Sequence, residues 1–303
     1  MNIQNHSGLT RFAWLSILAA LATIGLKLGA FWLTNSVGLL SDAIESFVNL
    51  VTAIVALIAL TIAARPANDE FSYGYSKVEF FSSGFEGSMI LIAAGSIAFT
   101  AIPRLLYPQP VEQLGLGLAV SAVAAVINLG VSRVLIQAGK RYRSITLEAD
   151  ARHLLTDVWT TAGVIVGVAL VGITGWERLD PILALLVAVN ILVTGFGLLR
   201  RSALGLMDAS LPPAELNQVQ EALKMFEPQG VKFHAVRTRS AAARSFVSMH
   251  ILVPGDWSVQ RGHHLAEQVE QEIHSRIPQI HIITHVEPLE DPASWKDTGL
   301  DRE

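Results

Sequence analysis

The 303-residue chain contains no cysteine, and this absence removes a large group of functions. Disulfide bonds, thiolate metal ligands and cysteine nucleophiles are all excluded. Any metal ion must therefore be held by His, Asp, Glu, Asn or water, which are the remaining common ligands.

Charge is also scarce, because charged residues make up 16% of the chain while 51% is hydrophobic and the mean hydropathy is +0.44. Soluble domains usually carry about 25% charged residues, so part of this chain is expected to face a lipid bilayer. The net charge of -4 shows no basic excess, which argues against a nucleic-acid partner. No His-Glu-x-x-His motif or other recognisable catalytic set is present, so we do not expect an enzyme.

Long apolar runs, by contrast, fill the first two thirds of the chain. Each reaches the roughly 20 residues that a helix needs to cross a hydrocarbon core of about 30 Å. The first run has no small-residue cleavage site after it, so it is interpreted as a membrane helix and not as a signal peptide. The runs predict six transmembrane helices near residues 13–34, 38–64, 79–102, 114–138, 144–175 and 179–200.

The basic residues predict the orientation of these helices. They gather at the N-terminus, in the second and fourth loops and after the sixth run, at Arg11, Arg65, Lys77, Lys140, Arg141, Arg143, Arg200 and Arg201. Because Lys and Arg are enriched in cytoplasmic loops, both termini are expected to be cytoplasmic, in a multi-pass protein of the cell (inner) membrane.

After Asp208 the sequence changes character. The apolar periods predict, in order, a helix, two strands, a helix and a strand, over LPPAELNQVQEALKMF, VKFHAVRTRS, RSFVSMHILV, HHLAEQVEQEIHSRI and QIHIITHVEPL. This order predicts an α+β (α-β-β-α-β) domain with its helices on one face of a sheet. We therefore expect a transmembrane domain at residues 1–208 and a cytoplasmic domain at 209–303, with the last 12 or so residues flexible.

Two polar pairs lie inside the apolar runs, where an ionisable residue costs about 2.5–3.5 kcal/mol on insertion scales. Glu45 and Asn49 are four residues apart in the second run, as are His153 and Asp157 in the fifth. Each pair therefore lies on one face of its helix, and the helical rise places both at a similar mid-membrane depth. Together they predict a four-ligand site for Zn²⁺, Fe²⁺, Co²⁺ or Mn²⁺. Hydrogen-bonded packing of polar pairs is the alternative.

Other intramembrane polar residues give weaker signals. Asp42 lies one turn outward of Glu45, where it could line an outer vestibule or cap the helix. Glu148 and Asp150 lie inward of His153 and could attract cations from the cytoplasm, although solvated helix-entry charges explain them equally well. Three further charged residues could pair within the bundle, with packing as the favoured explanation for the first of them: Lys27, Glu79 and Glu86.

Histidines concentrate in the C-terminal part, where seven of the nine lie between residues 234 and 285. His234, His250 and His285 occupy expected strand positions. Glu287 follows His285 by two residues, so both side chains lie on the same face of the strand. The cluster predicts a second metal site, and surface histidines without a ligand are the alternative.

Taken together, these residues resemble the cation diffusion facilitator family of zinc and iron efflux transporters. GLLSDAIESFVNL resembles the signature of the family's second span, and HLLTD its His-x-x-x-Asp pair in the fifth. FSYGYSKVE is similar to the region after the second span, and LMDASLP to the segment that joins the sixth span to the tail. The segments FHAVRTRSAAARSFVSMHILVPGD, HHLAEQVEQEI and THVEP are similar to the family's cytoplasmic domain.

The resemblance implies a homodimer of six-helix bundles with metallochaperone-like cytoplasmic domains, which exports a divalent cation in exchange for protons by alternating access. It implies a transport metal site made of Glu45, Asn49, His153 and Asp157. His153 and Asp157 would exchange protons there as metal binds. It implies a cytoplasmic metal site made of His234, His250, His263, His285 and Glu287. It also implies an interlocking charged pair, Lys77 and Asp208.

The chain departs from the family pattern at three places. The second span offers Glu45 and Asn49 where an Asp or His followed by an Asp is usual, so its site is less negative. Glu287 replaces the usual Asp of the tail. The loop after the second span lacks ligands at positions that bind metal in some members, so no metal site is expected at Asn68, Phe71 and Tyr75.

Zn²⁺ is the first expectation for the metal, both as the transported ion and as a structural ion in the tail, with Fe²⁺, Mn²⁺ and Co²⁺ as alternatives. Two rival functions remain. A non-transporting membrane metal sensor or assembly partner of the same family would keep the tail histidines without needing a working membrane site. A membrane enzyme, such as an intramembrane metalloprotease, would need a catalytic motif that the sequence lacks.

Overall fold

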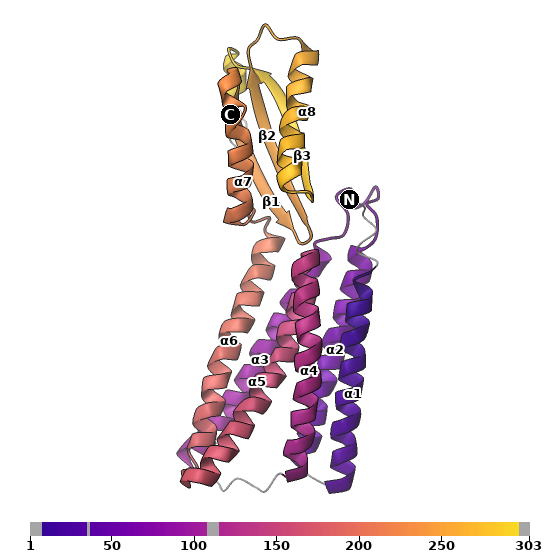
Figure 1. Ribbon diagram of the computed structural model, residues 1–303, viewed down its shortest axis with the longest axis vertical. Helices are drawn as coiled ribbons and strands as arrows, with labels where there is room; N and C mark the ends of the chain where they lie inside the picture. Colours follow the sequence, from indigo (N-terminus) through magenta and orange to yellow (C-terminus); the bar gives the residue numbers. More distant parts are fainter. Residues whose placement is uncertain (1–7, 35–36, 108–114, 297–303) are drawn as a thin grey trace. The chain divides into compact units, whose positions relative to one another are not determined.

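The computed structural model of the chain describes residues 8–34, 37–107 and 115–296 (Figure 1). Within its helices, the side chains of residues 33–45, 116–117, 168 and 180 are outside this description. The chain divides into two compact units, residues 2–203 and 204–303, and each has a hydrophobic core of its own.

The first unit is helical. Its helices are α1 (Thr10–Thr34), α2 (Val37–Ala63), α3 (Val78–Leu106), α4 (Gly115–Tyr142), α5 (Ile145–Thr174) and α6 (Leu179–Leu206). By length and composition, each of these six described helices can cross a membrane, which confirms the expected six spans. Large apolar side chains such as Trp32, Phe99 and Ile173 are exposed on the outside of the bundle, as contact with lipid requires.

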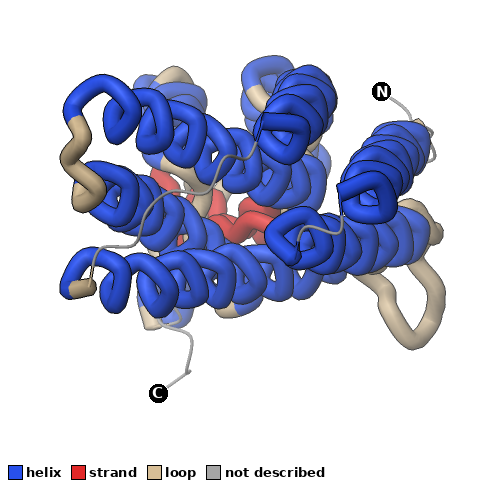
Figure 2. The backbone as a smooth tube through the Cα atoms, turned by 90° about the horizontal axis from the view of Figure 1, so that it is seen from below, coloured by secondary structure: helices blue, strands red, loops and turns tan. Residues whose placement is uncertain are grey.

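The helices pack side by side, as the view nearly along their axes in Figure 2 shows. Helix α5 contacts α2, α3 and α4, so it occupies a central place in the contact network. Helices α3 and α6 approach closely through small residues: a Cβ atom added at Gly87 would lie 3.1 Å from the backbone nitrogen of Leu199 and 3.3 Å from the carbonyl oxygen of Gly195. Close backbone approach at small residues is typical of membrane helix pairs.

The beginning of α5 is anchored by polar contacts. The Ser144 hydroxyl accepts a hydrogen bond from the backbone nitrogen of Leu147 at 3.4 Å, as an N-cap does, and donates one to Glu79 of α3. The helix ends at Gly175, which takes the left-handed conformation with φ of 69°. The cap fixes where α5 begins, and it therefore sets the depth of His153 and Asp157 along the helix.

The second unit contains α7 (Pro213–Lys224), β1 (Lys232–Ala241), β2 (Arg244–Val253), α8 (Val259–Arg276) and β3 (Ile280–Pro288). The strands form one sheet in the order β1-β2-β3, in which β1 and β2 are antiparallel and β2 and β3 are parallel. The parallel pair requires a crossover, which α8 provides. This arrangement confirms the expected α+β order of helix, strand, strand, helix, strand.

The core of this unit lies between the sheet and its helices. Met249 and Ile251 of β2 pack there with Val269 and Ile273 of α8. Because side chains alternate across a strand, His250 between them points to the opposite face of the sheet. That face carries His250 beside two buried apolar residues of the same strand, Phe246 and Leu252.

The segment after β3 turns back toward the sheet. Residues Pro292–Trp295 form a 3₁₀ helix, and the Trp295 ring lies 5.6 Å from that of His234. These residues belong to the stretch that the sequence suggested is flexible, and residues 297–303 of that stretch lie outside the described part of the chain.

Candidate metal sites

Asn49 of α2 meets His153 and Asp157 of α5 inside the helical unit. Their exposed fractions are 3%, 5% and 8%. The Asn49 amide nitrogen donates a hydrogen bond to Asp157 Oδ2, and His153 Nε2 lies 2.6 Å from Asn49 Oδ1. Because an amide oxygen can only accept, the hydrogen of this second bond is on Nε2. Asn49 thus bridges the imidazole and the carboxylate.

Asn128 of α4 joins the same group. Its amide nitrogen donates to Asp157 Oδ2 at 3.1 Å, and the residue is 3% exposed. Its own Oδ1 is buried and has no hydrogen-bond partner among the described residues. Asn128 is absent from the predicted site because it is neutral and stands alone in the fourth apolar run, whereas the predicted ligands form pairs one helical turn apart.

The fourth member of the predicted site, Glu45, lies on α2 one turn before Asn49, but its side chain is outside the described residues. The same holds for the side chain of Asp42. The backbone places Glu45 and Asn49 four residues apart on one helix, as expected from the sequence.

This group has ligand chemistry in an apolar interior. Buried polar groups need partners, and here Asn49, His153 and Asp157 satisfy one another. The same oxygen and nitrogen atoms are ligands for divalent cations, and ligands must give up protons to bind a metal. A cation at this place would therefore replace hydrogen bonds that involve His153 and Asp157.

The two acidic residues expected on the inward side of His153 differ in surroundings. Glu148 forms an ion pair with Arg201 at 2.5 Å. Asp150 is 1% exposed, and its Oδ1 accepts a hydrogen bond from Ser16 of α1 at 3.0 Å. Asp150 is therefore buried between helices and does not line an open vestibule in this conformation.

The charged residues expected to pair within the bundle also differ. Glu79 accepts hydrogen bonds at the start of α5, from the Ser144 hydroxyl and from the Thr146 backbone nitrogen at 3.4 Å. The expected pairing of Glu86 is wrong, because neither of its carboxylate oxygens has a hydrogen-bond partner in the described part of the chain.

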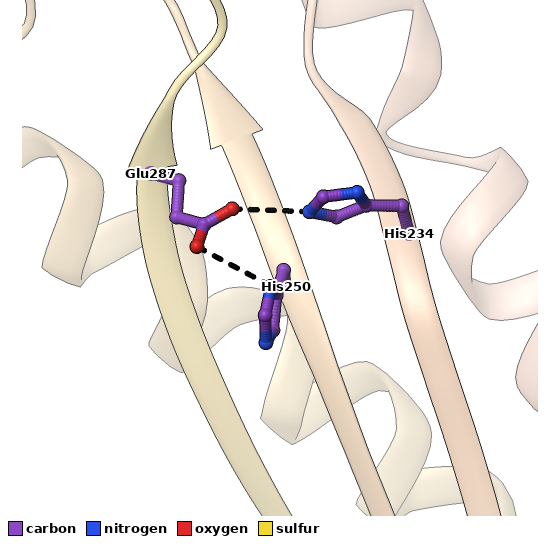
Figure 3. Close-up of side chains that lie close together, drawn as sticks. All are labelled: His234, His250 and Glu287. Atoms are coloured by element: carbon purple, nitrogen blue, oxygen red, sulfur yellow. Dashed lines mark hydrogen bonds and ion pairs between the residues drawn. The ribbon is translucent and has the colours of Figure 1, made fainter. Parts of the chain in front are cut away.

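A second group of ligand-type side chains lies on the sheet of the second unit (Figure 3). His234 Nε2 is 3.0 Å from Glu287 Oε2, and His250 Nδ1 is 3.3 Å from Glu287 Oε1. One ligand atom from each of these three residues lies within 4.8 Å of the others. Two imidazoles and a carboxylate on adjacent strands form a ligand set that suits Zn²⁺.

Strand register brings this group together. His234, His250 and His285 occupy opposite positions on β1, β2 and β3. The pairing of β1 is irregular just after His234, where Ala235 has φ of 47°, and such a bulge redirects neighbouring side chains. A pattern of alternating side chains does not predict this irregularity.

The remaining tail residues of the predicted site lie farther out. His285 Nε2 is 3.3 Å from Glu287 Oε1, but the His285 side chain is 62% exposed. His263 is on α8, where its ring is 6.2 Å from that of His264. Among the residues that the structure describes, His263 does not belong to the compact group of His234, His250 and Glu287.

Two other predicted features fall on loops. Asp208 pairs with Arg239 of its own unit at 3.2 Å, while Lys77 precedes α3 in the first unit, so the Lys77–Asp208 interlock stays a prediction. In the loop after α2, the Phe71 and Tyr75 rings pack 4.7 Å apart, and Asn68 donates to Tyr75 Oη at 3.0 Å.

Comparison with known proteins covers nearly the whole chain. Residues 13–207 match the cation efflux transmembrane domain, and residues 211–289 match the cytoplasmic domain of cation efflux proteins. An uncharacterized transporter of Synechocystis sp. is 54% identical over 285 residues, which cover 94% of this chain and 92% of that protein. The cation-efflux pump FieF of Salmonella arizonae is 26% identical over 279 residues, which cover 92% of each.

Among solved structures, the metal-bound C-terminal domain of the CzcD transporter from Thermotoga maritima is 29% identical. The match covers 27% of this chain and 99% of that one, with a TM-score of 0.25. The two domain matches, which together span most of the sequence, and the six membrane-length helices lead to one assignment. This integral membrane protein belongs to the cation diffusion facilitator family of metal efflux transporters.

Proposed function

We propose that the protein is a divalent metal cation/proton antiporter that exports Zn²⁺, or alternatively Fe²⁺, Mn²⁺ or Co²⁺, from the cytoplasm by alternating access. The observation that carries the proposal is the buried group of Asn49, His153 and Asp157 on α2 and α5. An imidazole and a carboxylate inside membrane helices are costly, and such residues usually mark an ion pathway. Membership in a metal efflux family and similarity to a protein named a cation-efflux pump support metal as the cargo.

The exchange follows from competition at shared atoms. In the structure, hydrogen bonds occupy His153 Nε2, Asn49 Oδ1 and Asp157 Oδ2. A cation that binds these atoms together with Glu45 must displace protons from the ligands, and protons that return must displace the cation. If metal binds to the site from one side of the membrane and protons bind to it from the other, the export of metal is coupled to the import of protons.

Alternating access requires the helices around the site to move. Helices α2 and α5 carry the proposed ligands, and α3 and α4 pack against α5. Rocking of these helices around a fixed midplane site would open it first to the cytoplasm and then to the outside. We place both termini in the cytoplasm, where the second unit could meet incoming metal.

The second unit would bind Zn²⁺ at His234, His250 and Glu287, with His285 at the edge of the site. This site lies on a folded sheet and not in the membrane helices, so its role would be structural or regulatory. We propose that this unit also joins two copies of the chain into a homodimer, because residues 211–289 match a family model whose name, ZT_dimer, denotes a dimerisation domain.

The proposal is tested by metal flux into proteoliposomes under an imposed pH gradient. Zn²⁺, Fe²⁺, Mn²⁺ and Co²⁺ are compared, with the parent protein beside Asp157→Ala. We expect flux of at least one metal that needs both the gradient and Asp157. Absence of flux for every metal, with metal still bound at the tail, would instead indicate a membrane metal sensor.

His153→Ala tests the proton step separately. If His153 exchanges protons during transport, this variant should show a weaker dependence of flux on pH than the parent protein. An unchanged pH profile would remove His153 from the proton pathway.

A further inference from the structure

Asn128 of α4 uses only one of the two polar atoms of its amide group. The nitrogen donates a hydrogen bond to Asp157 Oδ2 at 3.1 Å, whereas the oxygen, Oδ1, is buried and has no hydrogen-bond partner among the described residues. The residue is 3% exposed. A buried polar atom without a partner is uncommon in folded proteins and calls for an explanation. The four ligands predicted from the sequence leave this oxygen without a role.

The orientation of the amide follows from its partner. An ionised carboxylate only accepts hydrogen bonds, so the nitrogen of Asn128, and not its oxygen, must face Asp157. Asn49 of α2 donates to the same oxygen, Asp157 Oδ2. Two amides from different helices therefore hold one carboxylate oxygen in place.

A half-turn of the Asn128 amide about its Cβ–Cγ bond would exchange the positions of nitrogen and oxygen. Oδ1 would then lie about 3 Å from Asp157 Oδ2, where the nitrogen lies in the structure. Two oxygen ligands at right angles on one cation are also about 3 Å apart, when each metal–oxygen bond is about 2.1 Å long. Asn128 can therefore reach a cation on Asp157 Oδ2 without any movement of the α4 backbone.

We propose that Asn128 is a fifth ligand of the transport site and biases this site toward cations that accept more than four ligands. The inference rests on the proposed function, in which Glu45, Asn49, His153 and Asp157 are the other four ligands. Zn²⁺ in protein sites is usually tetrahedral, whereas Mn²⁺ favours octahedral sites made of oxygen. With Asn128 included, four ligands offer oxygen and one offers nitrogen. The site should then bind Mn²⁺ better, relative to Zn²⁺, than the other four ligands alone would.

The first test is the visible absorption of Co²⁺ bound to the purified full-length protein, which is strong for four tetrahedral ligands and weak for five or six. The starting protein carries Glu287→Gln, which weakens the tail site, and the absorption that Asp157→Asn removes belongs to the transport site. We expect Asn128→Leu, which puts an apolar side chain of similar size in place of the amide, to increase this absorption several-fold. Asn128→Asp keeps an oxygen at this position and should leave the absorption weak. Asn190→Leu is the matched control, because Asn190 is an exposed asparagine on another membrane helix, and it should change nothing.

The second test compares the affinities for Mn²⁺ and Zn²⁺ in the same starting protein. Asn128→Leu should weaken Mn²⁺ binding at least about 10-fold and Zn²⁺ binding much less. A residue that only positions Asp157 would weaken both equally, so equal losses would overturn the proposal. Unchanged Co²⁺ absorption in Asn128→Leu, or strong absorption in Asn128→Asp, would overturn it as well.

Failure of the proposed function would give a different result. If no Co²⁺ absorption depends on Asp157, the proposed transport site is wrong, and the role of Asn128 falls with it. If the absorption depends on Asp157 but not on Asn128, the transport site stands and only this inference is wrong. Failure of proton coupling would appear in the flux assay and not in these binding measurements.

Discussion

Replacing Asn49 with Asp should change the number of protons exchanged for each metal ion. The Asn49 amide nitrogen donates to Asp157 Oδ2, so Asn49→Asp would place a second carboxylate at hydrogen-bond distance, about 3 Å, from the first. Two negative charges at that distance repel by about 5 kcal/mol at an effective dielectric constant of about 20. This corresponds to a factor of several thousand against double ionisation. The metal-free variant should therefore share one proton between the two carboxylates.

A bound divalent cation removes that repulsion, so the shared proton should leave when metal binds. We expect about one additional proton released per metal ion, measured by a pH indicator in weakly buffered detergent solution at pH 7 during metal addition. Asn68→Asp is the control, because it adds an ionised carboxylate on an exposed loop and should leave the ratio unchanged. An unchanged ratio in Asn49→Asp would refute the reasoning that Asn49 and Asp157 share one ion site.

Three further outcomes follow from the structure. Glu287→Gln should weaken the affinity of the tail site for Zn²⁺ at least about 10-fold, as measured by competition with a chelating dye. His263→Gln should change that affinity less than about 2-fold. Equal losses of affinity in the two variants would place His263 in the site. Burial and, secondarily, the positive charges of Arg244 and His274 lower the pKa of His281, so its proton NMR titration should have a midpoint below that of a free histidine. Acid should then destabilise this unit, because the His281 imidazole is protonated at a higher pH in the unfolded chain than in the folded one. A titration midpoint at or above that of a free histidine would contradict this prediction. Gly87→Val should lower the free energy of unfolding in detergent by about 1–3 kcal/mol, as measured by thermal unfolding. Gly95→Ala should have little effect, because the space around Gly95 is open. Similar losses of stability in the two variants would argue against the close contact of α3 and α6.

The architecture was predictable because it depends on signals that are local in sequence. Apolar runs longer than a bilayer is thick identify the membrane helices, and the changes in apolar period after Asp208 identify the helices and strands of the second unit. The pair of His153 and Asp157 was predictable for the same reason, since a spacing of four residues fixes a common helix face.

Features that depend on contacts between distant segments were not predictable. Nothing in the sequence shows that Asn128 of α4 donates a hydrogen bond to Asp157, or that the Glu86 carboxylate has no hydrogen-bond partner among the described residues. The separation of His263 from the tail group depends on how α8 packs on the sheet, and the position of His234 depends on a bulge that a period-two pattern does not show. The spacing of residues in the sequence indicates which of them share a face of a helix or strand, whereas the packing of the elements determines which residues that face contacts.

The central claim is that metal and protons exchange through the group of Asn49, His153 and Asp157. The most direct test is to load proteoliposomes with a pH-sensitive dye and add metal outside, with no pH gradient imposed. Antiport predicts that metal entry drives protons out, so the lumen becomes more alkaline in the parent protein and does not in Asp157→Asn. Metal entry without any change in the internal pH would contradict the account.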